Sequence, residues 1–542
     1  MEQLYAAHRL SRDQEEIRLF HIHPGTWDAD IEGEFSVVSL KNDSEFVALS
    51  YTWGNVIDAP PTTVKVQGQP IPVSPNLHEA LRRLRWHALQ YEEVVIWADA
   101  LCINQADMQE KQHQIPLMRK IYSECQHTDV WLGELSHINL LPDPESRDPI
   151  EAVKNVIAKL KTDAHLTSIS LFDRDETDTH FTNVQKIFDS VSRSPWFTRR
   201  WVVQEAILAP VVKVFFGPVS MDLEYLCMAM DMYADHIEIN CCTTSELGHY
   251  QLRGSIRAFL QEFTSLRYYR DRYRGGKAHI LDLCMDFASR ETSLGHDYVY
   301  SLLGLTRPPS DIIPDYTIPL PVLFADICRD YVDQTRCLDF LPFAGNGDPQ
   351  SEIPSWAIDW TGPDSTWKWL TRLFNPVGQL SQFPKCTSLY LQILGYPIDK
   401  IEGIAEFPTG PSTANIVRLF AADVLGNERL GAEYPTGGTW LEAWLRTLSA
   451  DSCWGANSAR RFTSKDIAFY LAALSGSADN IGPTVQLAGG REVLAYAHMN
   501  DIFRMVDLVQ DGRVLFYTYQ GYIGVADDVI GTGDTIYLSL EC

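Results

Sequence analysis

The sequence predicts a doubly wound α/β domain with a parallel sheet, followed by a mainly helical region and a C-terminal α+β region with antiparallel strands. Three observations support this fold class. Between residues 46 and 218, short apolar runs alternate with stretches of helical periodicity, as in sheets whose crossovers are helices. Residues 219–335 have apolar positions at helical spacing. Residues 336–542 become richer in Pro, Gly and Trp and end in apolar–polar alternation.

Residues 46–218 are expected to contain four strands. The first follows Phe46 in FVALSYTWG, and the second is the run Val94–Trp97, whose continuous hydrophobicity indicates cover on both faces. TDVWLGE, from Thr128, and VVKVFFG, from Val211, supply the third and fourth strands. Right-handed helical crossovers would make all four strands parallel.

Three helices are expected between these strands. The first is NLHEALRRLR, with Asn76 as its N-cap. The second lies in QEKQHQIPLMRKIYSEC and starts near, or kinks at, Pro116, which has no backbone N–H to donate. The third is one helix over residues 194–209, and a charged stretch around residues 142–180 separates it from the third strand.

The flanking regions complete the predicted organisation. Residues 1–45 are interpreted as a lead-in in which IRLFHIH and FSVVSL could be short strands, and residues 219–335 as a helical region. Residues 336–542 form the α+β region, with a helical insertion near residues 414–475. The predicted boundaries therefore lie at 45/46, 218/219 and 335/336.

The chain of 542 residues has a net charge of −26, because 45 Lys and Arg stand against 71 Asp and Glu. Such a charge repels phosphate backbones and anionic lipids, so we expect no nucleic-acid partner and no membrane docking. No apolar run is long enough to span a bilayer, and the N-terminal segment lacks the apolar stretch of a secretory signal. The 11 cysteines are scattered, as in a reducing compartment, and we expect a cytoplasmic protein.

Three sequence blocks follow one another in a specific order. They are FVALSYTWGN from Phe46, VVIWADALCINQADMQEKQHQIPLMRKIYSECQHTDVWLGE from Val94, and RRWVVQEAILAP from Arg199. Together they resemble the three signature blocks of the fungal heterokaryon incompatibility (HET) domain. FASRETSLGHDYVYSLLGL, from Phe287, and PSWAIDW, from Pro354, resemble elements that often follow that domain.

The resemblance implies an effector of fungal self/non-self recognition and programmed cell death, a form of innate immunity. It implies other proteins as partners, with self-assembly on activation. HET domains are in turn distant relatives of TIR domains, which implies a TIR-like, flavodoxin-like sheet. Active TIR domains cleave NAD+ with a glutamate in a Trp-x-x-x-Glu pattern, and Trp201-Val202-Val203-Gln204-Glu205 fits that spacing. NAD+ would then be a substrate, and no resident cofactor is expected.

Trp201 and Glu205 are the candidate catalytic residues. They share a helix face, and no basic residue stands three or four positions from Glu205. A glutamate in such apolar surroundings either has a raised pKa in a cleft or has a partner from elsewhere. Its carboxylate could stabilise the oxocarbenium-like transition state of nicotinamide–ribose cleavage, because the cationic nicotinamide leaves without protonation. The alternative is that Trp201 is a core residue and that Glu205 forms a structural ion pair with Arg199 or Arg200.

A second group of residues is expected to bind the nucleotide, because ligands of open α/β sheets bind beyond the carboxyl ends of the strands. These residues follow the first two strands: Ser50, Tyr51, Trp53, Gly54, Asp99, Cys102, Asn104 and Gln105. Asp99 could bond ribose hydroxyls, and Trp53 could stack on a ring. The alternative is that Asp99 and Asn104 cap the next helix and that Trp53 and Trp97 are packing residues.

The remaining motifs are weaker. His21 and His23 have no evident partners, so no metal site is predicted. The absence of Walker and Gly-x-Gly-x-x-Gly loops disfavours a nucleotide triphosphatase, a kinase or a Rossmann dehydrogenase. The basic, aromatic segment Arg267–Lys277 either binds RNA or an acidic partner, or is a helix end neutralised by local acids. The function that competes with an NAD+ glycohydrolase is a catalytically inactive interaction and assembly module.

Overall fold

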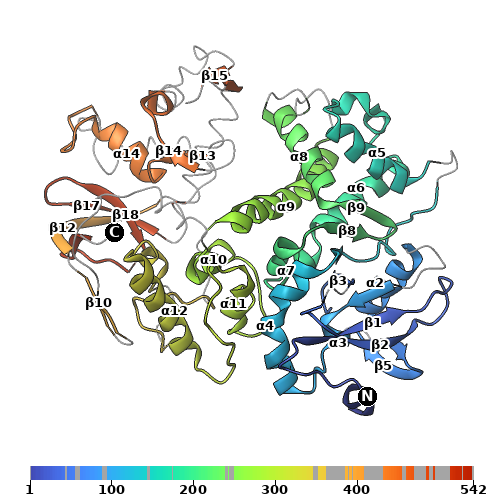
Figure 1. Cartoon of the computed structure of the whole chain (residues 1–542). Coiled ribbons are helices and arrows are strands. Elements are labelled where there is room, and N and C mark those ends of the chain that lie inside the picture. Colours follow the sequence, from blue (N-terminus) through green and yellow to red (C-terminus); the bar gives the residue numbers. More distant parts are fainter. Residues whose placement is uncertain are drawn as a thin grey trace. The chain divides into compact units, whose positions relative to one another are not determined.

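A computed structural model of the chain forms two compact units, Met1–Leu320 and Pro321–Cys542 (Figure 1). The predicted boundaries at 45/46, 218/219 and 335/336 stay predictions. The structure describes residues 2–42, 45–54, 62–87, 94–142, 147–173, 175–238, 242, 249–276, 278–345, 352–361, 385–387, 390–393, 395–407, 431–454, 459–468, 484–486, 492–494, 509, 513–527 and 529–539.

The first unit contains a nine-stranded sheet with the order β5-β4-β2-β1-β6-β3-β7-β8-β9. Its central strands are β3 (Val47–Ser50), β6 (Val94–Trp97), β7 (His127–Trp131) and β8 (Val212–Phe216). They pair in parallel, in the order β6-β3-β7-β8. This arrangement confirms the predicted parallel α/β sheet, and its order, second-first-third-fourth along the chain, is that of flavodoxin-like folds.

The outer strands make the whole sheet mixed. They are β1 (Glu16–Ile22), β2 (Glu32–Ser39), β4 (Thr62–Val66), β5 (Gln69–Val73) and β9 (Val219–Asp222). β1 pairs antiparallel with both β2 and β6, so the lead-in residues extend the same sheet. β4 and β5 form a hairpin, and its turn residues Gln67 and Gly68 both have positive φ, as a tight two-residue hairpin requires.

Two apolar cores lie on opposite faces of the sheet. Along β8, Val214 and Phe216 enter one core and Phe215 enters the other, because successive side chains of a strand point to opposite faces. Helices α1 (Glu2–Ala7), α2 (Pro75–His87), α3 (Asp99–Cys102) and α4 (Met108–Glu124) contribute to the core around Phe215. Helices α5 (Pro149–Lys161), α6 (Thr179–Ser192), α8 (Leu223–Glu238) and α9 (Tyr250–Gly275) contribute to the core around Val214.

Helix α4 begins earlier than the sequence suggested. Its N-cap is Asp107, whose side chain accepts hydrogen bonds from the backbone N–H groups of Gln109 and Glu110. Pro116 lies inside the helix rather than at its start. The correction follows from capping, because a side-chain acceptor at Asp107 satisfies N–H groups that the first helical turn leaves free.

The predicted helix over residues 194–209 is in fact two elements, the 3-10 helix η3 (Pro195–Thr198) and α7 (Val202–Leu208). The break lies at Arg199 and Arg200. Arg199 forms a β-bridge with Glu291, and the backbone N–H of Arg200 donates to the carbonyl of Glu291. Backbone groups that bond to another segment cannot continue the helical ladder, so tertiary contacts override local periodicity here.

The charged stretch around residues 142–180 contains α5, which the sequence interpretation did not single out. Asp148 caps this helix, and its apolar face is buried. The stretch also contains the 3-10 helices η1 (Leu166–Ser168) and η2 (Ser170–Asp173). Acidic residues here mark a capped amphipathic helix with a solvated outer face.

The predicted helical region is confirmed within the first unit. After α8 and α9 it continues with α10 (Ile280–Asp286), α11 (Asp297–Tyr300) and the 3-10 helix η5 (Leu303–Leu305). Helices α8 and α9 supply Leu226, Leu252, Phe259 and Phe263 to the core around Val214. They therefore cover that face of the sheet together with α5 and α6 (Figure 1).

The second unit begins within α12 (Leu320–Thr335), and η6 (Leu341–Phe343) follows. A four-stranded antiparallel sheet follows, with the order β18-β17-β12-β19. Its strands are β12 (Gly395–Glu406), β17 (Arg513–Thr518), β18 (Ile523–Asp527) and β19 (Thr535–Ser539). Short hairpins are β10 (Lys385–Cys386) with β11 (Leu391–Gln392), β13 (Ser452–Trp454) with β14 (Ala459–Arg461), and β15 (Thr484–Gln486) with β16 (Glu492–Leu494). The predicted α+β region with antiparallel strands is confirmed.

The expected helical insertion near residues 414–475 is only partly described. Within it lies α14 (Trp440–Leu448), which begins with a capping box between Thr439 and Glu442. The hairpin of β13 and β14 follows it. Residues 414–430, 455–458 and 469–475 of this prediction lie outside the described residues.

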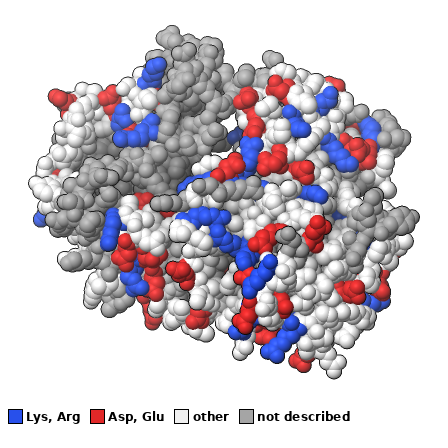
Figure 2. All heavy atoms as spheres, in the orientation of Figure 1, with Lys and Arg blue, Asp and Glu red and all other residues white. Residues whose placement is uncertain are grey.

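Two predictions, on membrane-spanning helices and on surface charge, can be compared with the described residues. No described helix combines the length and hydropathy needed to cross a bilayer. Figure 2 shows basic and acidic side chains side by side on the face in view. On the described surface of that face, the net charge of −26 is therefore not gathered into one acidic patch.

Candidate functional site

The candidate site lies at the carboxyl end of β3, where this strand meets two neighbouring elements from much later in the chain. Ser50 ends β3, and Trp196 comes from η3. Glu205 comes from α7, the helix that precedes β8. This end of the parallel strands is where open α/β sheets place their ligands.

A chain of hydrogen bonds joins these three side chains. The Ser50 hydroxyl donates to Glu205 Oε2 at 2.5 Å and accepts from the indole Nε1 of Trp196 at 2.8 Å. All three side chains are buried, and Glu205 is only 3% exposed. A buried carboxylate therefore has one hydroxyl donor, and that hydroxyl is itself fixed by an indole.

Burial raises the pKa of Glu205 to about 7. Arg199 lowers this pKa, the carboxylate of Asp99 raises it, and the hydrogen bond from Ser50 lowers it. Burial dominates because the low-dielectric interior disfavours the charged form. Near neutral pH the carboxyl group therefore populates both protonation states.

The ion pair considered as an alternative for Glu205 does not form. Arg199 donates through Nη1 to the backbone carbonyl of Tyr51. Arg200 is fully buried, and its guanidinium donates to the carbonyls of Phe287 and Cys284. Among the described residues, no cationic side chain lies within ion-pair distance of Glu205.

Trp201 stands at the N-cap position of α7 and packs against the core around Phe215. Its polar contact is to Asp297 of α11. Burial raises the pKa of Asp297, and hydrogen bonds from Tyr316 and Trp201 lower it. The hydrogen bond from Trp201 to Asp297 therefore holds the start of the helix that carries Glu205.

The residues after β3 differ in how deeply they are buried. Tyr51 is buried, and burial followed by the nearby Asp99 carboxylate raises its pKa well above the ordinary value. Trp53 is 39% exposed, and its indole donates to Asp99 Oδ2 at 2.8 Å. Gly54 is exposed with a positive φ of 75°. Trp53 and Asp99 thus form a hydrogen-bonded pair, termed the rim, that is more exposed than Ser50 and Tyr51.

The residues after β6 contribute fewer side chains to the candidate site. Cys102 is fully buried, its sulfur accepts from the Ala98 N–H, and burial raises its pKa to about 12. The Asn104 carboxamide accepts from the backbone N–H of Ala106, and Gln105 donates to the backbone carbonyl of Asp99. These contacts shape the loop, so Asp99 is the residue of this group whose side chain meets the rim.

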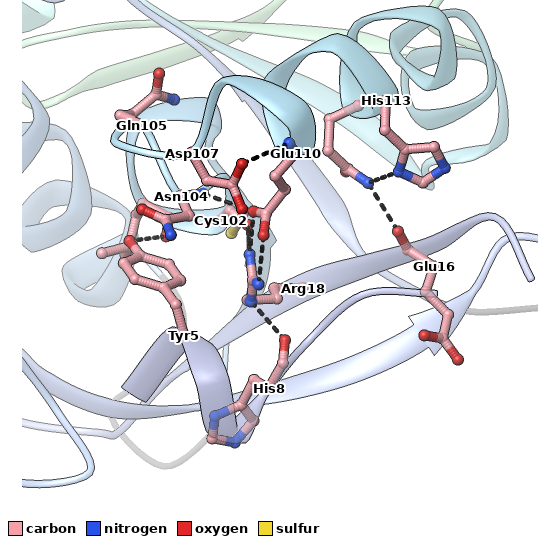
Figure 3. A network of polar contacts seen from close by, with 12 residues as sticks. Tyr5, His8, Glu16, Arg18, Cys102, Asn104, Gln105, Asp107, Glu110 and His113 are labelled. Atoms are coloured by element: carbon pink, nitrogen blue, oxygen red, sulfur yellow. Dashed lines mark hydrogen bonds and ion pairs between the residues drawn. The ribbon is translucent and has the colours of Figure 1, made fainter. Parts of the chain in front are cut away.

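A buried ion pair holds this loop, and sequence reasoning missed it (Figure 3). Arg18 of β1 is fully buried and bonds both oxygens of Glu110, at 2.5 and 2.9 Å. Glu110 Oε1 also accepts from the backbone N–H of Asn104, and Arg18 donates to the carbonyl of Cys102. The available signal was an arginine at an inward position of the apolar segment IRLFHIH.

Local groups hold the basic segment that starts at Arg267. Arg267 forms an ion pair with Asp231, and Arg272 pairs with Asp286. Arg270 is buried and donates to the carbonyls at the end of α7, those of Ala206, Ala209 and Pro210. The described part of this segment therefore supports α7 and favours the structural alternative.

Comparison with known proteins identifies the domain that holds this site. Residues 46–205 match the family described as heterokaryon incompatibility protein (HET). The chain carries a HET domain. The match begins one residue before β3 and ends at Glu205, so it spans the central strands β3, β6 and β7 and the candidate site residues.

A curated fungal protein is also similar to this chain. The chain is 24% identical over 405 residues to "Heterokaryon incompatibility protein 6, OR allele" of Neurospora crassa. The alignment covers 66% of this chain and 59% of that protein, so the chain spans about three fifths of the length of the curated relative. No solved structure matches the chain.

The raised pKa of Glu205 predicts a pH-dependent effect of Glu205→Gln. The folded protein holds the Glu205 proton more tightly than the unfolded chain, whose pKa is near 4.5. Stability contributed by the protonated group is therefore lost as pH rises from 4.5 to about 7. We expect Glu205→Gln to stabilise the HET domain above pH 7 by at most about 3 kcal/mol, and to lose this advantage near pH 4.5.

Urea denaturation of the wild type and Glu205→Gln across this pH range measures the two free energies of unfolding. The glutamine keeps an oxygen that can accept from Ser50, so the comparison isolates the charge. A difference between the two proteins that does not change with pH would contradict the raised pKa.

The Arg18–Glu110 pair predicts a large loss of stability on Glu110→Gln. The change leaves a fully buried guanidinium without its counter-ion, which costs about 3–5 kcal/mol. The double variant Arg18→Met with Glu110→Leu removes both charges and should recover much of that loss. Chemical denaturation checks both, with Lys65→Met as control because the Lys65–Asp30 pair is exposed. Equal effects of Glu110→Gln and Lys65→Met would contradict the role of the buried pair.

Proposed function

We propose that this chain is a HET-domain effector of fungal self/non-self recognition that promotes cell death by hydrolysing NAD+ at Glu205. The family match and the name of the Neurospora relative support the role in incompatibility. One observation carries the enzymatic part. A buried glutamate with a pKa of about 7, lacking a cationic partner among the described residues, lies at the ligand-binding end of a parallel sheet.

The proposed reaction needs one carboxylate. The bond between nicotinamide and ribose breaks with its electron pair going to nicotinamide, which leaves as a neutral base. Positive charge develops on the ribose, and ionised Glu205 stabilises it in a site shielded from water. Water then adds to the ribose carbon, and the products are nicotinamide, ADP-ribose and one proton.

Ser50 and Asp99 would have distinct positioning roles in this reaction. The Ser50 hydroxyl, held by Trp196, fixes the carboxylate of Glu205. Asp99 is half-buried and reaches the rim, where it could accept from ribose hydroxyls once the Trp53 indole releases it. Trp53 is the exposed aromatic surface on which a ring could stack.

Hydrolysis at this site requires that NAD+ can reach the Glu205 carboxylate. Glu205 is 3% exposed and Ser50 is fully buried, so a ribose cannot reach the carboxylate in this conformation. Activity would require the Trp53–Asp99 rim to open, and assembly with further copies or partners is the event we propose for it. A closed resting state would prevent constant loss of NAD+.

The same burial favours a second candidate function. If the rim does not open, the hydrogen-bonded set of Ser50, Trp196 and Glu205 is a structural link between β3 and α7. The HET domain would then be a catalytically inactive interaction and assembly module. The two functions differ in whether nicotinamide is released.

The decisive experiment follows nicotinamide release from NAD+ by the purified full chain, with and without a crowding agent. We expect release in the assembled state, and a loss of at least about a hundredfold for Glu205→Gln, because the developing ribose charge loses its counter-charge. The control is Glu262→Gln. Glu262 is a half-buried glutamate of α9 whose pKa is also raised by burial.

The outcomes separate the two functions. Release that is lost with Glu205→Gln and kept with Glu262→Gln supports hydrolysis at this site. No release in any assembled state, with the chain folded, supports the interaction module. Release that survives Glu205→Gln would reject Glu205 as the catalytic carboxylate.

A further inference from the structure

Three side chains that could bind a metal converge at the ends of α5 and α8, away from the HET site. His165 follows α5, His236 lies in the last turn of α8, and Cys242 follows α8. One ligand atom from each lies within 4.8 Å of the other two. Because His165 is separated from the other two by about 70 residues, sequence spacing did not reveal this cluster.

The two imidazole rings point toward one sulfur atom. Cys242 Sγ lies 3.8 Å from Nδ1 of His165 and 3.6 Å from Nδ1 of His236. Tetrahedral zinc with bond lengths of about 2.3 Å to sulfur and about 2.0 Å to nitrogen places such ligand atoms about 3.5 Å apart. The sulfur–nitrogen distances therefore already approach those of a zinc site.

The surroundings of these side chains also fit a metal. Nε2 of His236 contacts Asp163 Oδ1 at 3.0 Å, and Nδ1 is the ring nitrogen that faces Cys242. Histidines that ligate zinc commonly donate their other N–H to a carboxylate in this way. The Leu166 N–H donates to Cys242 Sγ at 3.3 Å, so the backbone helps to hold the sulfur between the two rings.

The backbone conformation of Asp163 is a further indication that its carboxylate is placed to orient His236. This residue has φ of 60°, the left-handed region that ends many helices, and glycine is favoured there. An aspartate at this position costs backbone energy but directs its carboxylate to His236.

We propose that His165, His236 and Cys242 bind a zinc ion, with Asp163 as a positioning residue for His236. One sulfur and two imidazoles suit zinc better than magnesium or calcium, which prefer oxygen. A further ligand or water would complete the tetrahedron. The ion would join the end of α5 to the end of α8 on the helical face of the first unit (Figure 1).

A nucleophilic cysteine is the chemical alternative for the same atoms. Cys242, His236 and Asp163 stand in the order thiol, base and orienting carboxylate. However, Cys242 is fully buried, so no substrate reaches its sulfur. A base–nucleophile pair also gives no reason for a second histidine directed at the same sulfur, whereas a metal does.

The test uses the full chain, purified without a histidine tag, loaded with Zn2+, desalted and analysed by elemental mass spectrometry. We expect about one zinc per chain and at least a tenfold lower content for Cys242→Ser. Cys227→Ser is the matched control, because Cys227 is equally buried in α8 but lies outside the cluster. Asp163→Asn should weaken zinc binding about 10–100-fold without abolishing it.

Two further measurements keep the proposal testable if Cys242→Ser does not fold. Co2+ bound to the wild type should give a thiolate-to-cobalt charge-transfer band. His165→Ala, at an exposed side chain, should lower zinc content without unfolding the chain. Zinc content no higher in the wild type than in His165→Ala, or bound Co2+ without a thiolate band, would overturn the site. Labelling of Cys242 by a substrate-like electrophile in place of metal binding would favour the nucleophile.

Discussion

The hydrogen bond from Ser50 to Glu205 is the contact on which the HET site depends. It joins the end of the central strand β3 to α7, and Trp196 fixes the shared hydroxyl from the other side. An uncompensated buried carboxylate would be costly, so this donor and the raised pKa together make the burial of Glu205 tolerable. The same contact keeps the carboxylate at the ligand-binding end of the sheet, whether the domain hydrolyses NAD+ or assembles with partners.

Two buried arginines hold segments next to this site. Arg18, on the N-terminal strand β1, holds Glu110 and the loop after α3. Arg270, on α9, holds the carbonyls at the end of α7. Guanidinium groups suit this role because their fixed donors can bond several carbonyls or a carboxylate at once. Helix α9 is therefore part of what positions the helix of Glu205, and strand β1 is part of what positions the loop after α3. Both elements lie outside the family match at residues 46–205.

The site and the proposed zinc cluster lie at different places within one unit. The first is at the carboxyl end of the parallel strands, and the second is at the ends of α5 and α8. A metal at the second place would stiffen the helical layer that packs against β7 and β8. The two places share no residue. Zinc content and NAD+ cleavage can therefore be measured as separate properties.

Local patterns determined the four parallel strands, the helical region and the three HET blocks, because apolar periodicity and short motifs are properties of neighbouring residues. They also brought Ser50, Asp99 and Glu205 together in expectation, since parallel strands share one carboxyl edge. They did not determine the break at Arg199-Arg200, the Arg18–Glu110 pair or the cluster of His165, His236 and Cys242. Each of these depends on partners distant in the chain, and only the folded structure decides which distant groups meet and at what distance.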